Sequence, residues 1–217
     1  MRIDEITLFT NTVQNQKHFY NNVLGFELVT DAIDKVSIKV GKSVLTFAYS
    51  QEFKPSHFAF NIPSNTITRA CNWLENRVEI LTYNNKPIVD FSSWNAKAIY
   101  FYDANKNIVE FIARRNLNIN SSHPFSSTEV LSISEIGIAT TNIEKMYNVI
   151  NNMSGIPIFD GDFSSFCAVG NDEGLFILIN KNEKKWFPTN DVAYTSDVIV
   201  KGDYNFAFKN GKIKELS

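Results

Sequence analysis

The stretch Trp94–Arg115, WNAKAIYFYDANKNIVEFIARR, decides the fold. It predicts two β-strands, Ala98–Tyr102 and Ile108–Ala113, because aromatic and β-branched residues are dense in both arms and residues 103–107 between them are turn formers. Glu110 is the exception, a carboxylate inside the apolar run Ile-Val-Glu-Phe-Ile. A carboxylate on a buried sheet face is costly unless it is paired or bound to a metal. Glu110 is therefore either a solvated residue of an edge strand or part of a buried site.

The sequence predicts two units with the order β-α-β-β-β, and the stretch quoted above ends the second. In the first unit we expect a strand, a helix that stops at Gly25, and three further strands: Ile3–Thr10, Val13–Leu24, Phe26–Ala32, Val36–Val40 and Ser43–Tyr49. The second predicts a strand at His57–Ile62, a helix at Asn65–Asn76, a strand near Ile80–Tyr83 and the two strands described above.

The chain then repeats itself after a linker. Residues 116–130 form the predicted linker, since Asn and Ser are abundant there and Pro124 interrupts it. Beyond it, Ile133-Ser134-Glu135-Ile136 aligns without a gap on Ile3-Asp4-Glu5-Ile6, and Gly155 aligns on Gly25. We therefore expect three regions: a two-unit domain at 1–115, the linker, and at 131–217 a third unit followed by a degenerate hairpin around Asn210-Gly211. Glu135 should lie in its unit where Glu5 lies in the first.

The composition is that of an ordinary globular protein. The 217 residues are 44% hydrophobic and 20% charged, with a net charge of −2 and no basic run, which argues against nucleic acid or an anionic membrane as a partner. No apolar stretch is long enough to span a bilayer, and residues 1–5 lack the apolar core of a signal peptide, so we expect a cytoplasmic protein. Cys71 and Cys167 are expected to be reduced, buried thiols rather than a disulfide or a nucleophile.

Four stretches in order carry a family resemblance. They are Ile3-Asp4-Glu5-Ile6-Thr7-Leu8, Phe19-Tyr20-Asn21-Asn22-Val23-Leu24-Gly25-Phe26, Ser56-His57-Phe58-Ala59-Phe60, and Tyr100-Phe101-Tyr102-Asp103 with Asn107-Ile108-Val109-Glu110. The chain resembles the vicinal oxygen chelate superfamily of glyoxalases, fosfomycin-resistance thiol transferases, bleomycin-resistance proteins and extradiol dioxygenases. The resemblance covers residues 1–115 well and 131–180 more weakly. It implies an α+β fold in which paired β-α-β-β-β units form an open eight-stranded barrel, here residues 1–115, with a third, partly degenerate repeat.

The resemblance also implies a metal site. Ligands in this superfamily project inward from the first and last strands of the paired units, which carries the ligand roles onto Glu5, His57 and Glu110. Each of the three is the polar exception in an apolar strand. The first-strand ligand is usually His or Gln, and the fourth strand, Val44-Leu45-Thr46, has no carboxylate where a further ligand often lies. The cation would be Mn²⁺, Zn²⁺, Fe²⁺, Co²⁺ or Mg²⁺, and the alternative is a metal-free pocket in which His57 hydrogen-bonds to a carboxylate.

Strand alternation extends this site. Thr7 and Phe9 share the face of Glu5, and Asn61 shares that of His57. We expect Thr7 and Tyr100 to contact substrate oxygen atoms as catalytic residues, and Trp94, Asn61 and Phe9 to bind substrate. For Tyr100 and Trp94, packing in the barrel or at its rim is an equally good interpretation.

The predicted function is that of a glyoxalase-like metalloprotein. A divalent metal acting as a Lewis acid on a small oxygen-rich substrate fits a lyase, an isomerase or a thiol transferase. An extradiol dioxygenase is less favoured, because iron oxygenases favour two His and one carboxylate. The alternative is not an enzyme but a metal-free protein that sequesters a small molecule, of the bleomycin-resistance type. Barrels in this superfamily are often completed between two chains, so the resemblance allows a homodimer.

Overall fold

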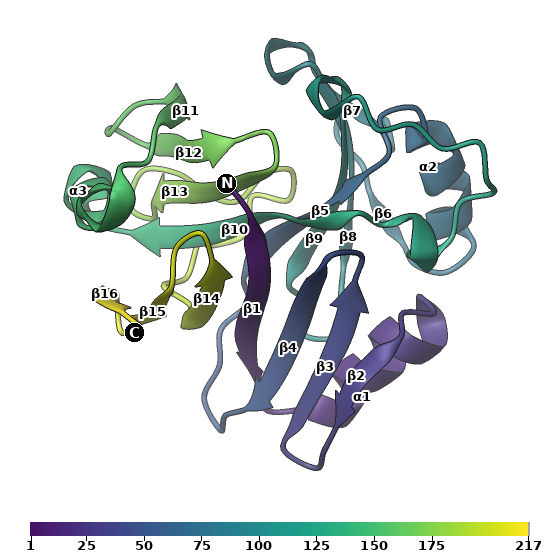
Figure 1. Cartoon of the computed structure of the whole chain (residues 1–217), viewed down its shortest axis with the longest axis horizontal. Helices are drawn as coiled ribbons and strands as arrows, with labels where there is room; N and C mark the ends of the chain where they lie inside the picture. The colour runs from purple at the N-terminus through teal and green to yellow at the C-terminus, as the bar shows by residue number, and fades with distance from the viewer. Residues whose placement is uncertain (217) are drawn as a thin grey trace.

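The computed structural model describes residues 1–216 and consists of two open sheets with three α-helices (Figure 1). The first sheet has the strand order β16-β15-β14-β1-β4-β3-β2. Its strands are β1 Ile3–Thr10, β2 Leu28–Asp31, β3 Lys35–Val40, β4 Ser43–Tyr49, β14 Val198–Gly202, β15 Phe206–Lys209 and β16 Lys212–Glu215. The first unit therefore pairs with the C-terminal hairpin strands.

The second sheet has the order β11-β12-β13-β10-β5-β9-β8-β6, with β7 also paired to β8. Its strands are β5 His57–Ile62, β6 Ile80–Leu81, β7 Val89–Phe91, β8 Ala96–Tyr102, β9 Ile108–Arg114, β10 Ser132–Thr140, β11 Ile158–Gly161, β12 Phe166–Asn171 and β13 Gly174–Asn180. The helices are α1 Val13–Lys17, which continues in π-helical geometry to Val23, α2 Ile67–Glu75 and α3 Ile143–Ser154. No helix within residues 1–216 combines the length and the apolar character needed to cross a bilayer.

The expectation that residues 1–115 share one sheet is wrong. Strand β5 of the second unit pairs with β10 of the third unit, and β1 of the first unit pairs with β14. The α+β class and the paired β-α-β-β-β units are as predicted, but the second unit pairs with the third, and the first pairs with the C-terminal strands β14–β16. The predicted and the observed pairings are both compatible with the local sequence pattern. Every unit begins with a strand that has a free edge, and the first strand of any other unit can pair with that edge.

The registers of the first and third units are equivalent. Glu5 lies beside Val44 in the parallel pair β1–β4, and Glu135 lies beside Leu175 in the parallel pair β10–β13. Both strands also carry an irregularity one step earlier, between Ile3 and Glu5 and between Ile133 and Glu135. Glu135 thus occupies in its unit the position that Glu5 occupies in the first.

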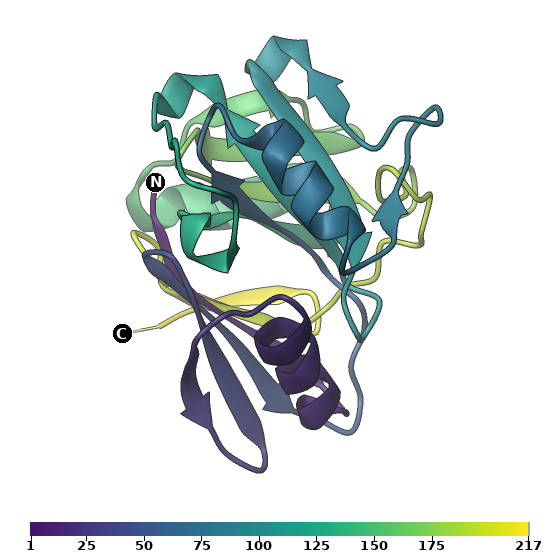
Figure 2. The ribbon, with the colours of Figure 1, turned by 90° about the vertical axis from the view of Figure 1, so that its right-hand side faces the viewer.

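The second sheet separates two apolar layers. One face carries side chains such as Phe58, Phe60 and Phe111 into the main core, which the first sheet and the helices complete. Two contacts join the sheets there: the rings of Phe26 and Phe60 lie 6.0 Å apart, and the Tyr20 hydroxyl donates to Asp103 over 3.2 Å. Figure 2 shows α1 and α2 on the same side of the molecule, each against its own sheet. The opposite face of the second sheet is left to line a cavity of its own.

Candidate metal centre

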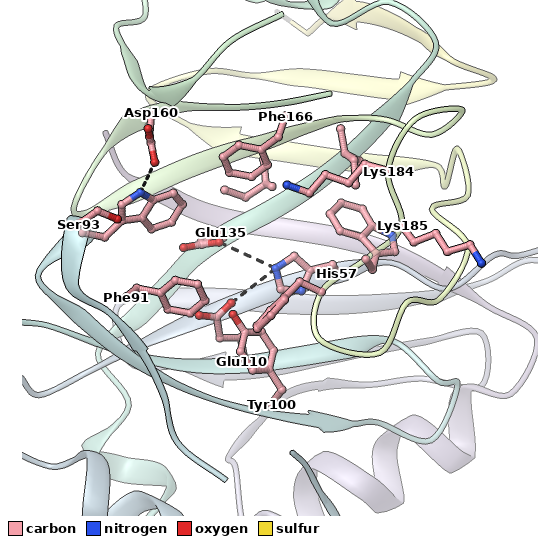
Figure 3. Close-up of a pocket in the computed structure, with 15 residues that line it drawn as sticks. His57, Phe91, Ser93, Tyr100, Glu110, Glu135, Asp160, Phe166, Lys184 and Lys185 are labelled. Carbon is pink, nitrogen blue, oxygen red and sulfur yellow. Dashed lines mark hydrogen bonds and ion pairs between the residues drawn. The ribbon is translucent and has the colours of Figure 1, made fainter. Parts of the chain in front are cut away.

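Three ionisable side chains converge on that second face. Glu110 of β9 and Glu135 of β10 both lie beside Ala59, one in a parallel and the other in an antiparallel pair with β5. His57 lies two residues before Ala59 on the same strand and therefore on the same face. Because Ala59 has only a methyl group, the two carboxylates and the imidazole can approach one another above it (Figure 3).

The three groups are close but not hydrogen-bonded to one another. His57 Nε2 lies 3.6 Å from Glu110 Oε2 and 3.9 Å from Glu135 Oε2. One candidate ligand atom from each residue lies within 4.8 Å of the others, and all three residues are buried. His57 Nδ1 lies 3.1 Å from the carbonyl oxygen of Ile108. Since a carbonyl only accepts, Nδ1 donates to it, and Nε2 is the ring nitrogen that faces the carboxylates.

The two carboxyl groups have different surroundings. Burial, and then the charge of Glu135, raise the pKa of Glu110 well above its usual range. Glu135 instead has a cation beside it, because the Arg114 guanidinium donates to its Oε1. Arg114 is itself fully buried, and its Nη1 has no hydrogen-bond partner within residues 1–216. Burial also raises the pKa of Tyr100, which pairs with Glu110 across the strands, so its hydroxyl stays protonated.

A cavity of about 380 Å³ opens beside the three groups. Its lining combines aromatic and aliphatic side chains with several charged ones: His57, Glu110, Glu135, Asp160, Lys184, Lys185, Phe91, Ser93, Trp94, Tyr100, Phe166, Ile177, Ile179, Trp186 and Phe187. The Trp94 indole donates to Asp160 over 2.5 Å, which ties one wall to β11. The segment after β13 supplies Lys184 to Phe187 and forms the facing wall.

Four of the predicted site residues lie in this cavity. His57 and Glu110 come together, and Tyr100 and Trp94 line the walls beside them. The structure does not bring Glu5 to them. Glu5 lies in the first sheet, where Oε1 accepts from Thr46 over 3.2 Å and Oε2 from Lys201 over 3.0 Å. The predicted convergence of Glu5 with His57 is therefore wrong, because β1 pairs with β14 and not with β5.

The other three predicted residues lie elsewhere. Thr7 lies between Thr46 and Ile199 in the first sheet. Phe9 belongs to the same sheet, with Lys209 Nζ 5.3 Å from its ring centre. Asn61 is in the second sheet but beyond the cavity, and its amide donates to Ser132 and to the carbonyl of Glu173. None of the three contributes to the wall around His57.

Sequence reasoning missed Glu135, Arg114 and the segment 184–187. The internal repeat was the available signal for Glu135, since it aligns Glu135 on Glu5, the predicted ligand. The counterpart of Glu110 in the third unit is Ile177, which lies two residues after Leu175, the strand partner of Glu135. Three of the four symmetric positions, all but that of Ile177, therefore carry ligand-type side chains.

The two cysteines lie outside the cavity lining. Burial raises the pKa of Cys71 and Cys167 to about 11, as expected for inert thiols.

The chain is similar to known proteins in structure only. No protein-family model matches the chain, and no curated protein matches it. A "putative dioxygenase" from Bacillus subtilis is similar with a TM-score of 0.61 and 15% identity, over 83% of this chain and 64% of that one. A glyoxalase I variant from Zea mays is similar with a TM-score of 0.55 and 11% identity, over 82% of this chain and 66% of that one. The chain thus spans just under two thirds of the length of both, and it shares their fold, as its resemblance to the vicinal oxygen chelate superfamily predicts.

Proposed function

We propose that His57, Glu110 and Glu135 hold a divalent metal, and that the protein acts on a small oxygen-rich substrate in the adjoining cavity. The observation that carries this proposal is the convergence of three buried ligand-type atoms within 4.8 Å. Metal–ligand distances of ~2.0–2.2 Å place neighbouring ligand atoms ~3.0–3.6 Å apart, and the distances from His57 Nε2 need only a small closure to reach that range.

The chemistry of the donor set also fits a cation. Burial, and then the charge of Glu135, raise the pKa of Glu110 and favour a proton on its carboxyl group, while Arg114 pairs with Glu135. A divalent cation would replace that proton and remove the repulsion. The Nδ1 hydrogen bond of His57 to a backbone carbonyl is the arrangement that orients metal-binding histidines. One imidazole and two carboxylates suit Mn²⁺, Zn²⁺, Fe²⁺, Co²⁺ or Mg²⁺.

The residues around the centre support polarisation of a chelated substrate. A bound metal would supply Lewis-acid stabilisation of negative charge on substrate oxygen. Tyr100, neutral and beside Glu110, is placed to donate a hydrogen bond to such an oxygen. The aromatic walls exclude water from the reacting atoms and strengthen both effects. Isomerisation, a lyase step or thiol addition fits this arrangement better than oxygenation, since only one histidine is present.

A second candidate is a metal-free protein that sequesters a small molecule. The ion pair between Arg114 and Glu135 favours it, because the pair already neutralises one of the two carboxylates. The aromatic lining of the cavity would then hold the ligand. In either case all the residues of the centre belong to one chain, so a homodimer would not be needed to complete it.

Metal analysis separates the two candidates. Protein purified without chelator should contain about one equivalent of divalent metal, and the chelator-treated protein should gain thermal stability when Mn²⁺, Zn²⁺, Co²⁺ or Fe²⁺ is added. His57→Ala should lose both properties, whereas His18→Ala, an exposed histidine on the first helix, should keep them. Circular dichroism checks that each variant is folded. Wild-type protein with no metal and no stabilisation by any of these ions would overturn the metal proposal and leave sequestration.

A further inference from the structure

The cavity beside the candidate metal centre is lined by charges of both signs. Glu110 and Glu135 are buried residues of the lining, and Lys184 is an exposed one. A third carboxylate, Asp160, lies on the wall but is engaged by the Trp94 indole. A ligand that fills the cavity therefore meets carboxylates, or a metal they hold, and an ammonium group as well.

Lys184 is directed into this space. Its Nζ lies 4.4 Å from the ring centre of Phe166, which is itself part of the lining. Figure 3 shows the amine of Lys184 pointing over Phe166 toward the centre of the cavity, while the amine of Lys185 points away. Across residues 1–216, no carboxylate lies within 4.0 Å of either amine. An ammonium group has three donors, and a ring face satisfies them only in part.

The neighbouring Trp186 adds a buried N–H donor. The residue is only 6% exposed, and its ring centre lies 5.2 Å from that of His57. The indole N–H has no acceptor within the described residues. A buried N–H without a partner is costly, so an acceptor atom on a ligand in this cavity would be favourable.

The aromatic lining of the cavity favours a flat ligand. Trp94 is stacked with Phe166, with ring centres 6.2 Å apart and planes 28° apart, and Phe91 lies 6.0 Å from Trp94. Phe187 packs edge-on against Phe91 at 5.8 Å and against Tyr100 at 5.6 Å, which joins these rings into one cluster. Aromatic faces of this kind hold a planar π-system better than a bulky aliphatic group.

From these observations we infer that the cavity binds a flat, aromatic anion whose carboxylate or phosphate group pairs with Lys184, with its ring against the aromatic lining. The inference rests on the proposed function only in taking this cavity as the substrate site. The anion recognition belongs to Lys184 and not to the metal, so it persists in metal-free protein.

Binding to chelator-treated protein tests this inference apart from the metal. The probes are 2-naphthoate and 2-naphthyl phosphate as flat anions, 2-naphthamide as the neutral analogue, and cyclohexanecarboxylate as an anion that is not flat. Affinity is measured by titration calorimetry for the wild type, Lys184→Gln and Lys185→Gln. The adjacent Lys185 has the same charge and loop position but a different direction, which makes it a matched control.

We expect the wild type to prefer one or both flat anions over 2-naphthamide and cyclohexanecarboxylate. Lys184→Gln should weaken the flat anions about fivefold or more and leave 2-naphthamide unchanged, while Lys185→Gln should change neither more than about twofold. Equal effects of the two substitutions, equal binding of 2-naphthamide and the anions, or no binding of any probe would each overturn the inference. A wild type that binds metal but shows no anion preference refutes this inference alone. One that prefers anions but binds no metal refutes the proposed metal centre alone.

Discussion

Glu110 and Glu135 lie on the two strands that flank β5, and both project over Ala59. This placement puts two carboxylates into a buried space with one imidazole and one guanidinium. His57 and Glu110 could be predicted from the sequence because each interrupts an apolar strand. Arg114 could not, because a charged residue at the end of a strand usually faces solvent, and only the pairing of β9 with β5 beside β10 buries it against Glu135.

The retained proton on Glu110 should make the metal-free protein less stable as pH rises. Its pKa is raised in the folded state, so the folded protein holds a proton that the unfolded chain releases above the ordinary carboxyl pKa of about 4.3. The free energy of unfolding of the wild type, relative to Glu110→Gln, should fall as the pH rises above about 5, by up to about 1.4 kcal/mol per unit, and level off above the raised pKa. Urea unfolding in chelator at several pH values measures this difference. A difference that does not change with pH would show that Glu110 titrates normally.

At the scale of elements, strand β10 and the segment after β13 fit together through Gly137. A Cβ at Gly137 would lie 2.6 Å from the Trp186 ring and 3.1 Å from the carbonyl oxygen of His57. The indole thus packs directly on the strand backbone, next to the imidazole. The sequence shows a glycine inside a strand, which marks a close approach, but it does not show which side chain approaches.

Gly137→Ala should therefore displace Trp186 from the cavity wall. We expect a loss of about 1–3 kcal/mol in the free energy of unfolding, the usual cost of an extra methyl group in a packed site. The tryptophan emission should shift to longer wavelength as the indole becomes exposed. Gly155→Ala is the control, because it should lower stability without moving the indole. Nothing lies within 4 Å of a Cβ at this position, so the substitution adds only the backbone strain of a positive φ. Unchanged emission in Gly137→Ala would mean that the indole is not seated there.

At the scale of the whole molecule, the three units and the C-terminal hairpin pair in an order that local sequence pattern does not determine. Strand and helix periodicity, the Gly25 stop and the repeat at Ile133 predicted the units themselves, and the α+β fold followed. Whether β5 pairs with β1 or with β10 depends on contacts between residues far apart in sequence. One such contact, the Ser43 hydroxyl donating to the carbonyl of Ile3 and accepting from the Ile133 amide, links the two sheets where β1 and β10 lie side by side.

That pairing gives two sheets of similar design with different chemistry. In the first sheet, Glu5 pairs with Lys201, and Ile199 occupies the position that corresponds to His57. Within residues 1–216, Glu5 belongs to no group of three ligand-type residues that could share a cation. His57, Glu110 and Glu135 of the second sheet form such a group, so the proposed metal centre lies between the second and third units.

The most direct test compares the two equivalent glutamates. Metal content and the Mn²⁺- or Zn²⁺-induced rise in melting temperature should be measured for the wild type, Glu135→Gln and Glu5→Gln, with each variant compared with its own chelator-treated form. The account predicts that Glu135→Gln loses the bound metal and the stabilisation, while Glu5→Gln keeps both at the wild-type level. Loss of metal in Glu5→Gln together with retention in Glu135→Gln would contradict it, because the centre would then lie in the first sheet.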